Sequence, residues 1–177
     1  MSDQQIIISG FGGQGILSAG RILAYAGMLE NKNVSWLPSY GPEMRGGTAN
    51  CNVIISGEAV GSPILNSATS LIVMNGPSLD KFEGIVESGG LIIIDSSLVD
   101  KEPKRKDVEV CGIPATKTAF EMGNPAFANI ILLGKLIAVT KIVSKEAFEE
   151  SLKKMLPEKK HHLIPVEMKA LEFGMQY

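Results

Sequence analysis

The first residues that could do chemistry are the glycines of a turn near the start of the chain. Gly10, Gly12 and Gly15 give the spacing GxGxxG in the letters GFGGQG, directly after an apolar run and before a helical pattern. At such a turn, free backbone N–H groups and the positive end of the helix dipole favour an anion. The turn therefore either contacts an anion or a cofactor, or its glycines only permit close packing between a strand and a helix.

The residues after this turn disfavour an ordinary dinucleotide site. In such a site the second strand ends in an acidic residue that holds the ribose hydroxyls. Here the second strand ends in the letters WLPSY, residues 36–40. A phosphate-binding P-loop is also remote, because Gln14 and Gly15 are followed by Ile16 and Leu17, and the required lysine is missing.

A second candidate site is the loop SYGPEMRGG, residues 39–47. It combines flexible glycines, a rigid proline, an aromatic side chain and two opposite charges, and loops of this kind often carry function. Arg45 could hold a carboxylate or phosphate in its guanidinium fork, and Glu43 could orient Arg45 or cap a helix of a neighbouring subunit. The alternative is a surface loop whose local ion pair contributes little energy.

Other polar and thiol side chains are better explained by structure. His161 and His162 are adjacent, so on a helix they point about 100° apart and make a poor metal pair. Asp95 follows an apolar strand, where it could bind a ligand, but we prefer a cap or turn role. Cys51 and Cys111 are far apart and are expected to be small apolar residues in a reduced compartment.

Composition limits the classes of partner. The chain has 177 residues, 45% of them hydrophobic, so we expect a single domain over residues 1–177 with a sizeable core. The formal net charge of −2 provides no overall basic field for nucleic acid or anionic lipid. Lys101, Lys104, Arg105 and Lys106 do cluster; they could meet phosphates or an acidic partner, although we prefer a solvated loop.

The sequence also predicts a cytoplasmic location. Residues 1–5 carry no positive segment of the kind that begins a secretion signal. Residues 59–79 lack charges, but prolines and asparagines interrupt them, so we expect no membrane span there.

Apolar periodicity predicts strands that alternate with helices. We expect strands at residues 4–9, 33–37, 48–55, 67–74, 90–95 and, at a sheet edge, 108–111, with helices at 14–31, 77–86, 114–122, 125–143, 144–156 and 165–173. This pattern predicts an α/β fold: a three-layer α/β/α sandwich with a mostly parallel or mixed sheet and a Rossmann-like first β-turn-α unit. The helix at 125–143 is apolar nearly all round, so either the core or a partner covers it, and we prefer the core.

The two motifs in this order resemble a known family. GFGGQG followed by SYGPEMRGG, with a strand at residues 50–55, is similar to the gamma subunit of pyruvate, 2-oxoglutarate and 2-oxoisovalerate:ferredoxin oxidoreductases, which is also found as a fused domain in single-chain members. The similarity covers essentially the whole chain, including GGLIIIDSSLV and KKHHLIPVEMKALEFG. A separate gamma chain with this loop looks most similar to the 2-oxoglutarate or 2-oxoisovalerate enzymes.

The resemblance implies a complex that decarboxylates a 2-oxoacid on thiamine diphosphate, passes electrons through iron–sulfur clusters to ferredoxin and releases an acyl-CoA. It implies that alpha and beta subunits, with a delta subunit as a further candidate, hold the thiamine diphosphate, Mg and clusters. CoA is then a co-substrate, and this chain holds no cofactor alone. The residues agree, because the chain has no GDG thiamine signature and no cysteine cluster motif.

On the same resemblance, this chain is inactive when isolated, with a homodimer as a candidate form, and contributes neither catalytic residues nor metal ligands. The residues that we expect at its CoA-facing or subunit-facing surface are Gly12, Gly13, Gln14, Gly15, Tyr40, Glu43, Arg45, Gly46 and Gly47. The alternative function is a stand-alone dinucleotide- or flavin-binding module, which the missing acidic residue after the second strand disfavours.

Overall fold

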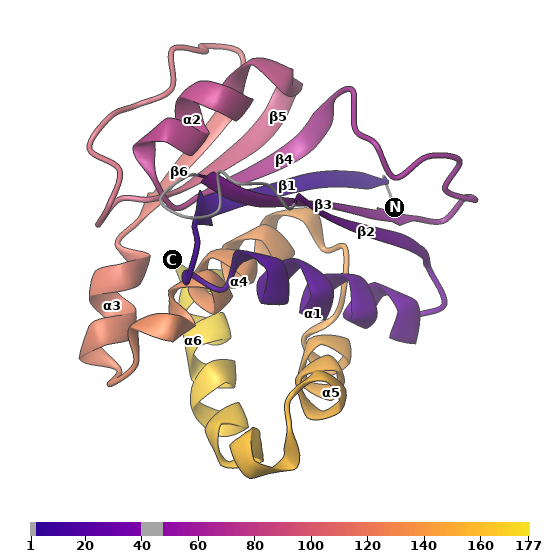
Figure 1. Ribbon diagram of the computed structural model, residues 1–177, viewed down its shortest axis with the longest axis vertical. Helices are drawn as coiled ribbons and strands as arrows, with labels where there is room; N and C mark the ends of the chain where they lie inside the picture. Colours follow the sequence, from indigo (N-terminus) through magenta and orange to yellow (C-terminus); the bar gives the residue numbers. More distant parts are fainter. Residues whose placement is uncertain (1–2, 40–47) are drawn as a thin grey trace.

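The computed structural model describes residues 3–39 and 48–177, and within them six strands form one mixed sheet (Figure 1). Their spatial order is β2-β3-β1-β4-β5-β6. The strands are β1 (Gln4–Phe11), β2 (Asn33–Ser39), β3 (Thr48–Ser56), β4 (Ala68–Val73), β5 (Val86–Asp95) and β6 (Glu109–Ile113). β1, β4, β5 and β6 run parallel, whereas β3 runs antiparallel to both β1 and β2. The expected mixed sheet is confirmed.

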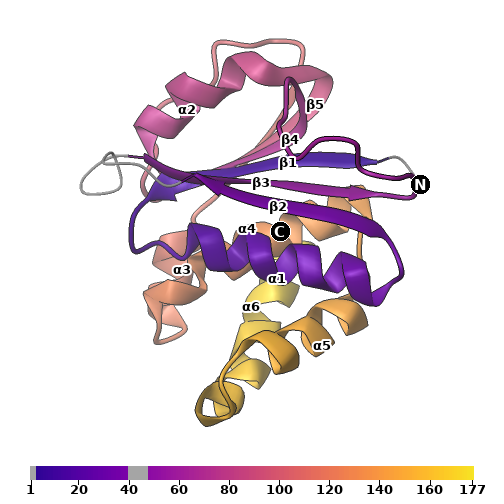
Figure 2. The same cartoon turned by 45° about the vertical axis from the view of Figure 1, so that its right-hand side comes forward.

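Helices cover both faces of the sheet. The α-helices are α1 (Ile16–Leu29), α2 (Gly76–Phe82), α3 (Ala115–Glu121), α4 (Ala128–Thr140), α5 (Lys145–Met155) and α6 (Ile164–Gln176), and the short 3-10 helices are η2 (Glu83–Ile85), η3 (Pro125–Phe127) and η4 (Glu158–Leu163). α2 lies on one face of the sheet, and the other α-helices lie on the opposite face (Figures 1 and 2). α5 packs on α1, and α6 packs on α4. The expected α/β/α layers are therefore present, with α5 and α6 added outside one helical layer.

The element boundaries differ most from prediction between α2 and β5. The expected helix at 77–86 ends at Phe82 and continues as a 3-10 turn, and the strand expected from residue 90 begins at Val86. The pairing of β5 with β4 shifts register between Val86, opposite Ala68, and Leu91, opposite Ser70. The extra residues of β5 interrupt the regular pairing, which a simple strand pattern does not reveal.

The apolar helix α4 lies in the core, as preferred from its sequence. Ile131, Leu132, Leu133 and Leu136 are fully buried. They are covered because α4 packs against β5 on one side and against α6 on another. No helix in the described residues is long and apolar enough to cross a membrane.

α4 and α6 approach so closely that their backbones touch. A Cβ atom built at Gly174 of α6 would lie 1.8 Å from the Ile131 carbonyl oxygen, and one at Gly134 of α4 would lie 2.1 Å from the Leu171 carbonyl oxygen. A side chain at either position would collide with the backbone of the other helix and force the two helices apart. Glycine at these two positions therefore sets the distance between the helices.

We predict that Gly174→Ala lowers the free energy of unfolding by about 2 kcal/mol or more, because the added methyl group displaces α6 from α4. Urea denaturation measures the change. Gly84→Ala is the matched control, because nothing lies within 4 Å of a Cβ atom built at Gly84. Equal stability of the two variants would contradict the close backbone contact.

Candidate functional site

The glycine turn, residues 12–15, joins β1 to α1 at the carboxyl end of β1. β1 and β4 are neighbours in the sheet, and the chain leaves them in opposite directions: β1 leads through α1 to β2, whereas β4 leads through α2 to β5. α1 and α2 cover opposite faces of the sheet (Figure 2). Ligands of open α/β sheets commonly bind where strand connections diverge in this way.

The side chain of Gln14 fixes the shape of this turn. Its Oε1 accepts a hydrogen bond from the Phe11 N–H at 2.6 Å, and its Nε2 donates to the Met74 carbonyl at 3.2 Å. Met74 follows β4, and its own N–H donates to the Ser9 carbonyl of β1 at 2.9 Å. Both polar groups of the Gln14 side chain are therefore engaged within the chain. The backbone of the turn is the part best placed to meet a ligand.

Gly15 begins α1 without a capping side chain. Its φ of 74° and ψ of 20° are left-handed, no side chain accepts a hydrogen bond from the first turn, and that turn holds no acidic residue. Gly12 and Gly13 are exposed. Because the first N–H groups of a helix lack partners within it, this 14-residue helix presents a positive, donor-rich end at the glycine turn. Such an end can hold a phosphate or a carboxylate.

Asn129, near the start of α4, attaches the turn to the helical layer. Its Nδ2 donates to the Gln14 carbonyl at 3.0 Å, and the residue is 8% exposed. A Cβ atom at Gly15 would lie 2.2 Å from this nitrogen. The sequence analysis missed Asn129, although a polar residue within the apolar stretch AFANIILL is the signal that could have revealed it.

A cavity of about 220 Å³ opens between the glycine turn, the start of α4 and η4. Gly13, Gln14 and Gly15 form part of its wall. Among the described residues that line it, Lys160 and Glu167 are the ones with ionisable side chains. The sequence analysis missed Glu167 as well, since an acidic residue in the first turn of a helix usually faces solvent.

The second predicted motif lies mostly outside the described residues. This holds for the predicted site residues Tyr40, Glu43, Arg45, Gly46 and Gly47. The flanks of the segment are described: Ser39 at the end of β2 pairs with Asn50, and Thr48 at the start of β3 pairs with Phe11 at the end of β1. The segment therefore leaves and rejoins the sheet at the end that carries the glycine turn.

Asp95 serves as the turn and cap residue that we preferred. It is fully buried, and its carboxylate accepts hydrogen bonds from the Ser97 N–H at 3.1 Å, the Thr116 N–H at 3.2 Å and the Thr116 hydroxyl at 2.6 Å. These bonds tie the end of β5 to the start of α3. The carboxylate is fully used by the fold.

The cysteines and histidines form no site in the described part of the chain. Burial raises the pKa of the Cys51 thiol to about 12, and burial also raises the pKa of Cys111, so neither is an activated nucleophile. A ring nitrogen of His161 lies 3.0 Å from the Leu156 carbonyl, and His162 is exposed. No group of three or more His, Cys, Asp or Glu side chains among the described residues could hold a metal ion.

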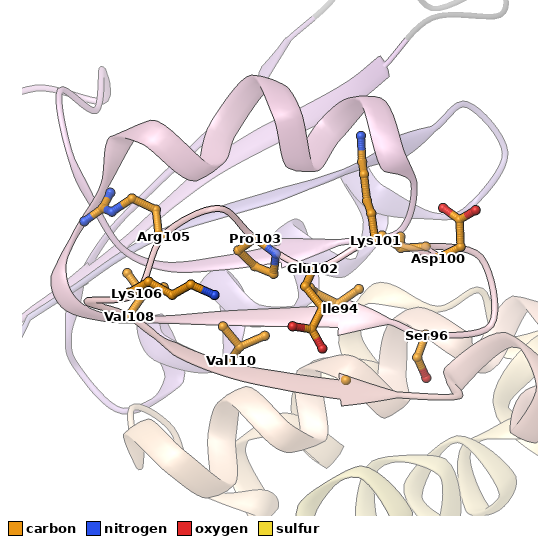
Figure 3. A pocket seen from close by; sticks show the side chains of 12 residues that line it. Ile94, Ser96, Asp100, Lys101, Glu102, Pro103, Arg105, Lys106, Val108 and Val110 are labelled. Atoms are coloured by element: carbon orange, nitrogen blue, oxygen red, sulfur yellow. The ribbon is translucent and has the colours of Figure 1, made fainter.

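A second cavity, of about 550 Å³, lies beside the basic loop that follows β5 (Figure 3). Lys101 is paired with Asp80, and Arg105 is paired with Asp107 at 2.6 Å. Arg105 also donates to the Val86 carbonyl at 2.9 Å, and its side chain points away from the cavity in Figure 3. The hydrogen bond from Arg105 lowers the pKa of the Asp107 carboxyl to about 2. Two of the four clustered basic side chains, Lys101 and Arg105, are thus paired locally, which favours a solvated loop over an anion site.

Residues 5–177 match the model of the family described as pyruvate ferredoxin/flavodoxin oxidoreductase. The chain belongs to this family. It is 39% identical over 174 residues to ketoisovalerate oxidoreductase subunit VorA of Methanothermobacter marburgensis, covering 98% of this chain but 36% of that protein. It is 40% identical over 158 residues to 2-oxoglutarate synthase subunit KorC of Methanocaldococcus jannaschii, covering 87% of this chain and 84% of that protein. The chain thus spans about a third of the length of the first relative and most of the second.

Solved structures share the fold. The gamma subunit of a keto/oxoacid ferredoxin oxidoreductase from Geobacter sulfurreducens is 32% identical, with a TM-score of 0.84 over 98% of this chain and 96% of that chain. A 2-oxoglutarate:ferredoxin oxidoreductase from Magnetococcus marinus, solved with 2-oxoglutarate, coenzyme A and succinyl-CoA bound, is 24% identical, with a TM-score of 0.88 over 99% of this chain and 31% of that chain. The α/β fold expected from the sequence is confirmed.

We predict that Gly15→Ala lowers the free energy of unfolding by about 2 kcal/mol or more, because it adds left-handed strain and a clash with Asn129. In the Asn129→Ala background the same substitution keeps the strain but loses the clash, so it costs less. Urea denaturation of the two single variants and the double variant gives the coupling free energy. Strictly additive costs would show that Asn129 does not constrain the turn.

Proposed function

We propose that this chain, as a single domain over residues 1–177, is the gamma subunit of a cytoplasmic 2-oxoacid:ferredoxin oxidoreductase. The observation that carries the proposal is the uncapped start of α1 at the diverging strands β1 and β4, in a chain that belongs to this family. In this proposal alpha and beta subunits, with a delta subunit as a further candidate, hold the thiamine diphosphate, Mg and iron–sulfur clusters. The chain alone is inactive.

The proposed reaction converts a 2-oxoacid and CoA into carbon dioxide and an acyl-CoA. The 2-oxoacid loses its carboxylate carbon as carbon dioxide, and its acyl carbon loses two electrons and forms a bond to the sulfur of CoA. The thiol proton is released, and ferredoxin accepts the two electrons; iron–sulfur clusters held by partner subunits would supply the path for them. CoA carries several phosphate charges, so a subunit that contacts CoA is expected to offer hydrogen-bond donors or positive charge to an anion.

The glycine turn meets that need. Backbone N–H groups at Gly12 and Gly13 and the start of α1 supply donors without a positive side chain. The guanidinium group of Arg45 would add a positive charge to this surface, because the described flanks of its segment adjoin the glycine turn. We therefore assign the CoA-facing or subunit-facing surface to Gly12, Gly13, Gln14, Gly15, Tyr40, Glu43, Arg45, Gly46 and Gly47. The presence of coenzyme A in the Magnetococcus marinus structure agrees with this choice, although that likeness extends to the fold alone.

We propose 2-oxoglutarate as the 2-oxoacid. The similarity to the 2-oxoglutarate synthase subunit from Methanocaldococcus jannaschii, 40% identical over 158 residues, supports this choice. A comparison of 2-oxoglutarate, 2-oxoisovalerate and pyruvate as substrates of the purified complex tests it. A higher kcat/KM for either of the other two acids would contradict the choice.

The alternative function, a stand-alone dinucleotide- or flavin-binding module, has a specific structural feature against it. β3 lies between β1 and β2, so the end of β2 is one strand removed from the glycine turn. In a dinucleotide fold the second strand adjoins the first and brings an acidic residue to the ribose. Here the end of β2 has the letters LPS, without an acidic residue.

The proposal is tested by native co-purification with the tagged chain, followed by an assay of viologen reduction that depends on both a 2-oxoacid and CoA. We expect partner subunits that bear thiamine diphosphate and iron–sulfur clusters, activity in the complex and none in the isolated chain. Recovery of the chain without such partners, together with micromolar binding of NAD or flavin, would support the alternative.

We predict that Gly13→Asp raises the KM for CoA of the complex by about tenfold or more, because it places a negative charge where the phosphate is expected. Gly13→Asn is the matched control, since Asn tolerates positive φ as Asp does and a Cβ atom at Gly13 meets nothing within 4 Å. Steady-state kinetics compares the two variants. Equal KM values for CoA would contradict the placement of an anion at this turn.

A further inference from the structure

Glu167, in the first turn of α6, is a mostly buried residue with an ionisable side chain. It is 7% exposed. Within the described part of the chain, we find no hydrogen bond or ion pair to its side chain. Its oxygens are not among the fully buried polar atoms that lack a partner in the described residues, so the carboxyl group reaches the solvent of a cavity. A mostly buried ionisable residue that faces a cavity often belongs to a binding site.

The surroundings of Glu167 connect it to the glycine turn. It lines the 220 Å³ cavity whose wall also contains Gly13, Gln14 and Gly15. The positive end of α1 therefore faces the same space as the carboxyl group. Lys160, on η4, is at the cavity wall as well and is exposed. A negative charge at Glu167 thus occupies a space that otherwise favours an external anion.

We infer that Glu167 is an internal anion of the glycine-turn cavity: it opposes an external dianion at the turn, so that such a ligand binds together with a proton taken up by this carboxyl group. This inference rests on the proposed anion-binding role of the turn. It adds that the affinity of the turn for an anion depends on pH. In the balanced step, Glu167 carboxylate, one proton and the free dianion become the neutral carboxylic acid and the bound dianion.

The surrounding charges determine the direction of this pH dependence. Burial raises the pKa of Glu167, and Lys160 partly opposes that rise. The wall residues from α1 and from the α4 side carry no ionisable side chain, so Lys160 is the one described charge that faces Glu167 across the cavity. His161 follows Lys160 in the sequence, but a nitrogen of its ring is hydrogen-bonded to the Leu156 carbonyl. The affinity for a dianion therefore rises as the pH falls through the raised pKa of Glu167.

The test is a titration of the full chain with sulfate, which stays a dianion over the whole pH range, followed by the amide NMR shifts of residues 12–17. Glu167→Gln removes the charge while keeping the shape. Glu158→Gln is the matched control, because Glu158 is exposed on η4, the element that brings Lys160 to the cavity wall, and does not itself line the cavity.

We expect Glu167→Gln to bind sulfate about tenfold more tightly than the wild type at pH 7, with little dependence on pH. The wild type and Glu158→Gln should agree with each other and approach Glu167→Gln as the pH falls. Equal affinities of wild type and Glu167→Gln would overturn the inference and leave the proposed function standing. Absence of sulfate binding at residues 12–17 in all three would overturn both.

A second measurement needs no variant. The carboxyl carbon shift of Glu167 in the wild type, followed against pH, should give a higher pKa in saturating sulfate than without it. An unchanged pKa would overturn the inference even if Glu167→Gln failed to fold.

Discussion

The candidate site depends on one side chain, Gln14, which joins the ends of two neighbouring strands. By bonding to the Phe11 N–H and to the Met74 carbonyl, it fixes the turn between β1 and α1 to the end of β4. Asn129 then holds the Gln14 carbonyl from α4. The side chain and the carbonyl of Gln14 are therefore both bonded within the chain. The donors that can meet a ligand are the backbone N–H groups of the glycines and of the uncapped start of α1.

This arrangement explains how a chain without evident catalytic residues can serve an oxidoreductase. The buried carboxylate of Asp95, for example, accepts hydrogen bonds from Ser97 and Thr116 and joins β5 to α3, so it is not available to a ligand. At the diverging strands the turn presents a backbone that can attract an anion, and Glu167 lines the same cavity. We infer that the chain provides binding and control for a reaction whose electron transfer occurs elsewhere in the complex.

Local pattern in the sequence predicted the elements well, because alternating apolar runs, caps and prolines act over short distances. The apolar run of β1 and the small-residue face of α1 are examples. The insertion of β3 between β1 and β2 could not be predicted, since strand order depends on contacts far apart in sequence. For the same reason Asn129 and Glu167 were missed: their importance comes from burial against the turn. Arg45 and its neighbours stay a prediction, because they lie outside the described residues.

In the proposed function, the backbone of the glycine turn receives CoA in the assembled complex. Amide hydrogen–deuterium exchange of residues 12–17 can be measured in the complex with and without saturating CoA. We expect slower exchange in this stretch when CoA is present, beyond any protection that the partner subunits give. Exchange at residues 12–17 that saturating CoA leaves unchanged, in a complex that turns over with CoA, would contradict it.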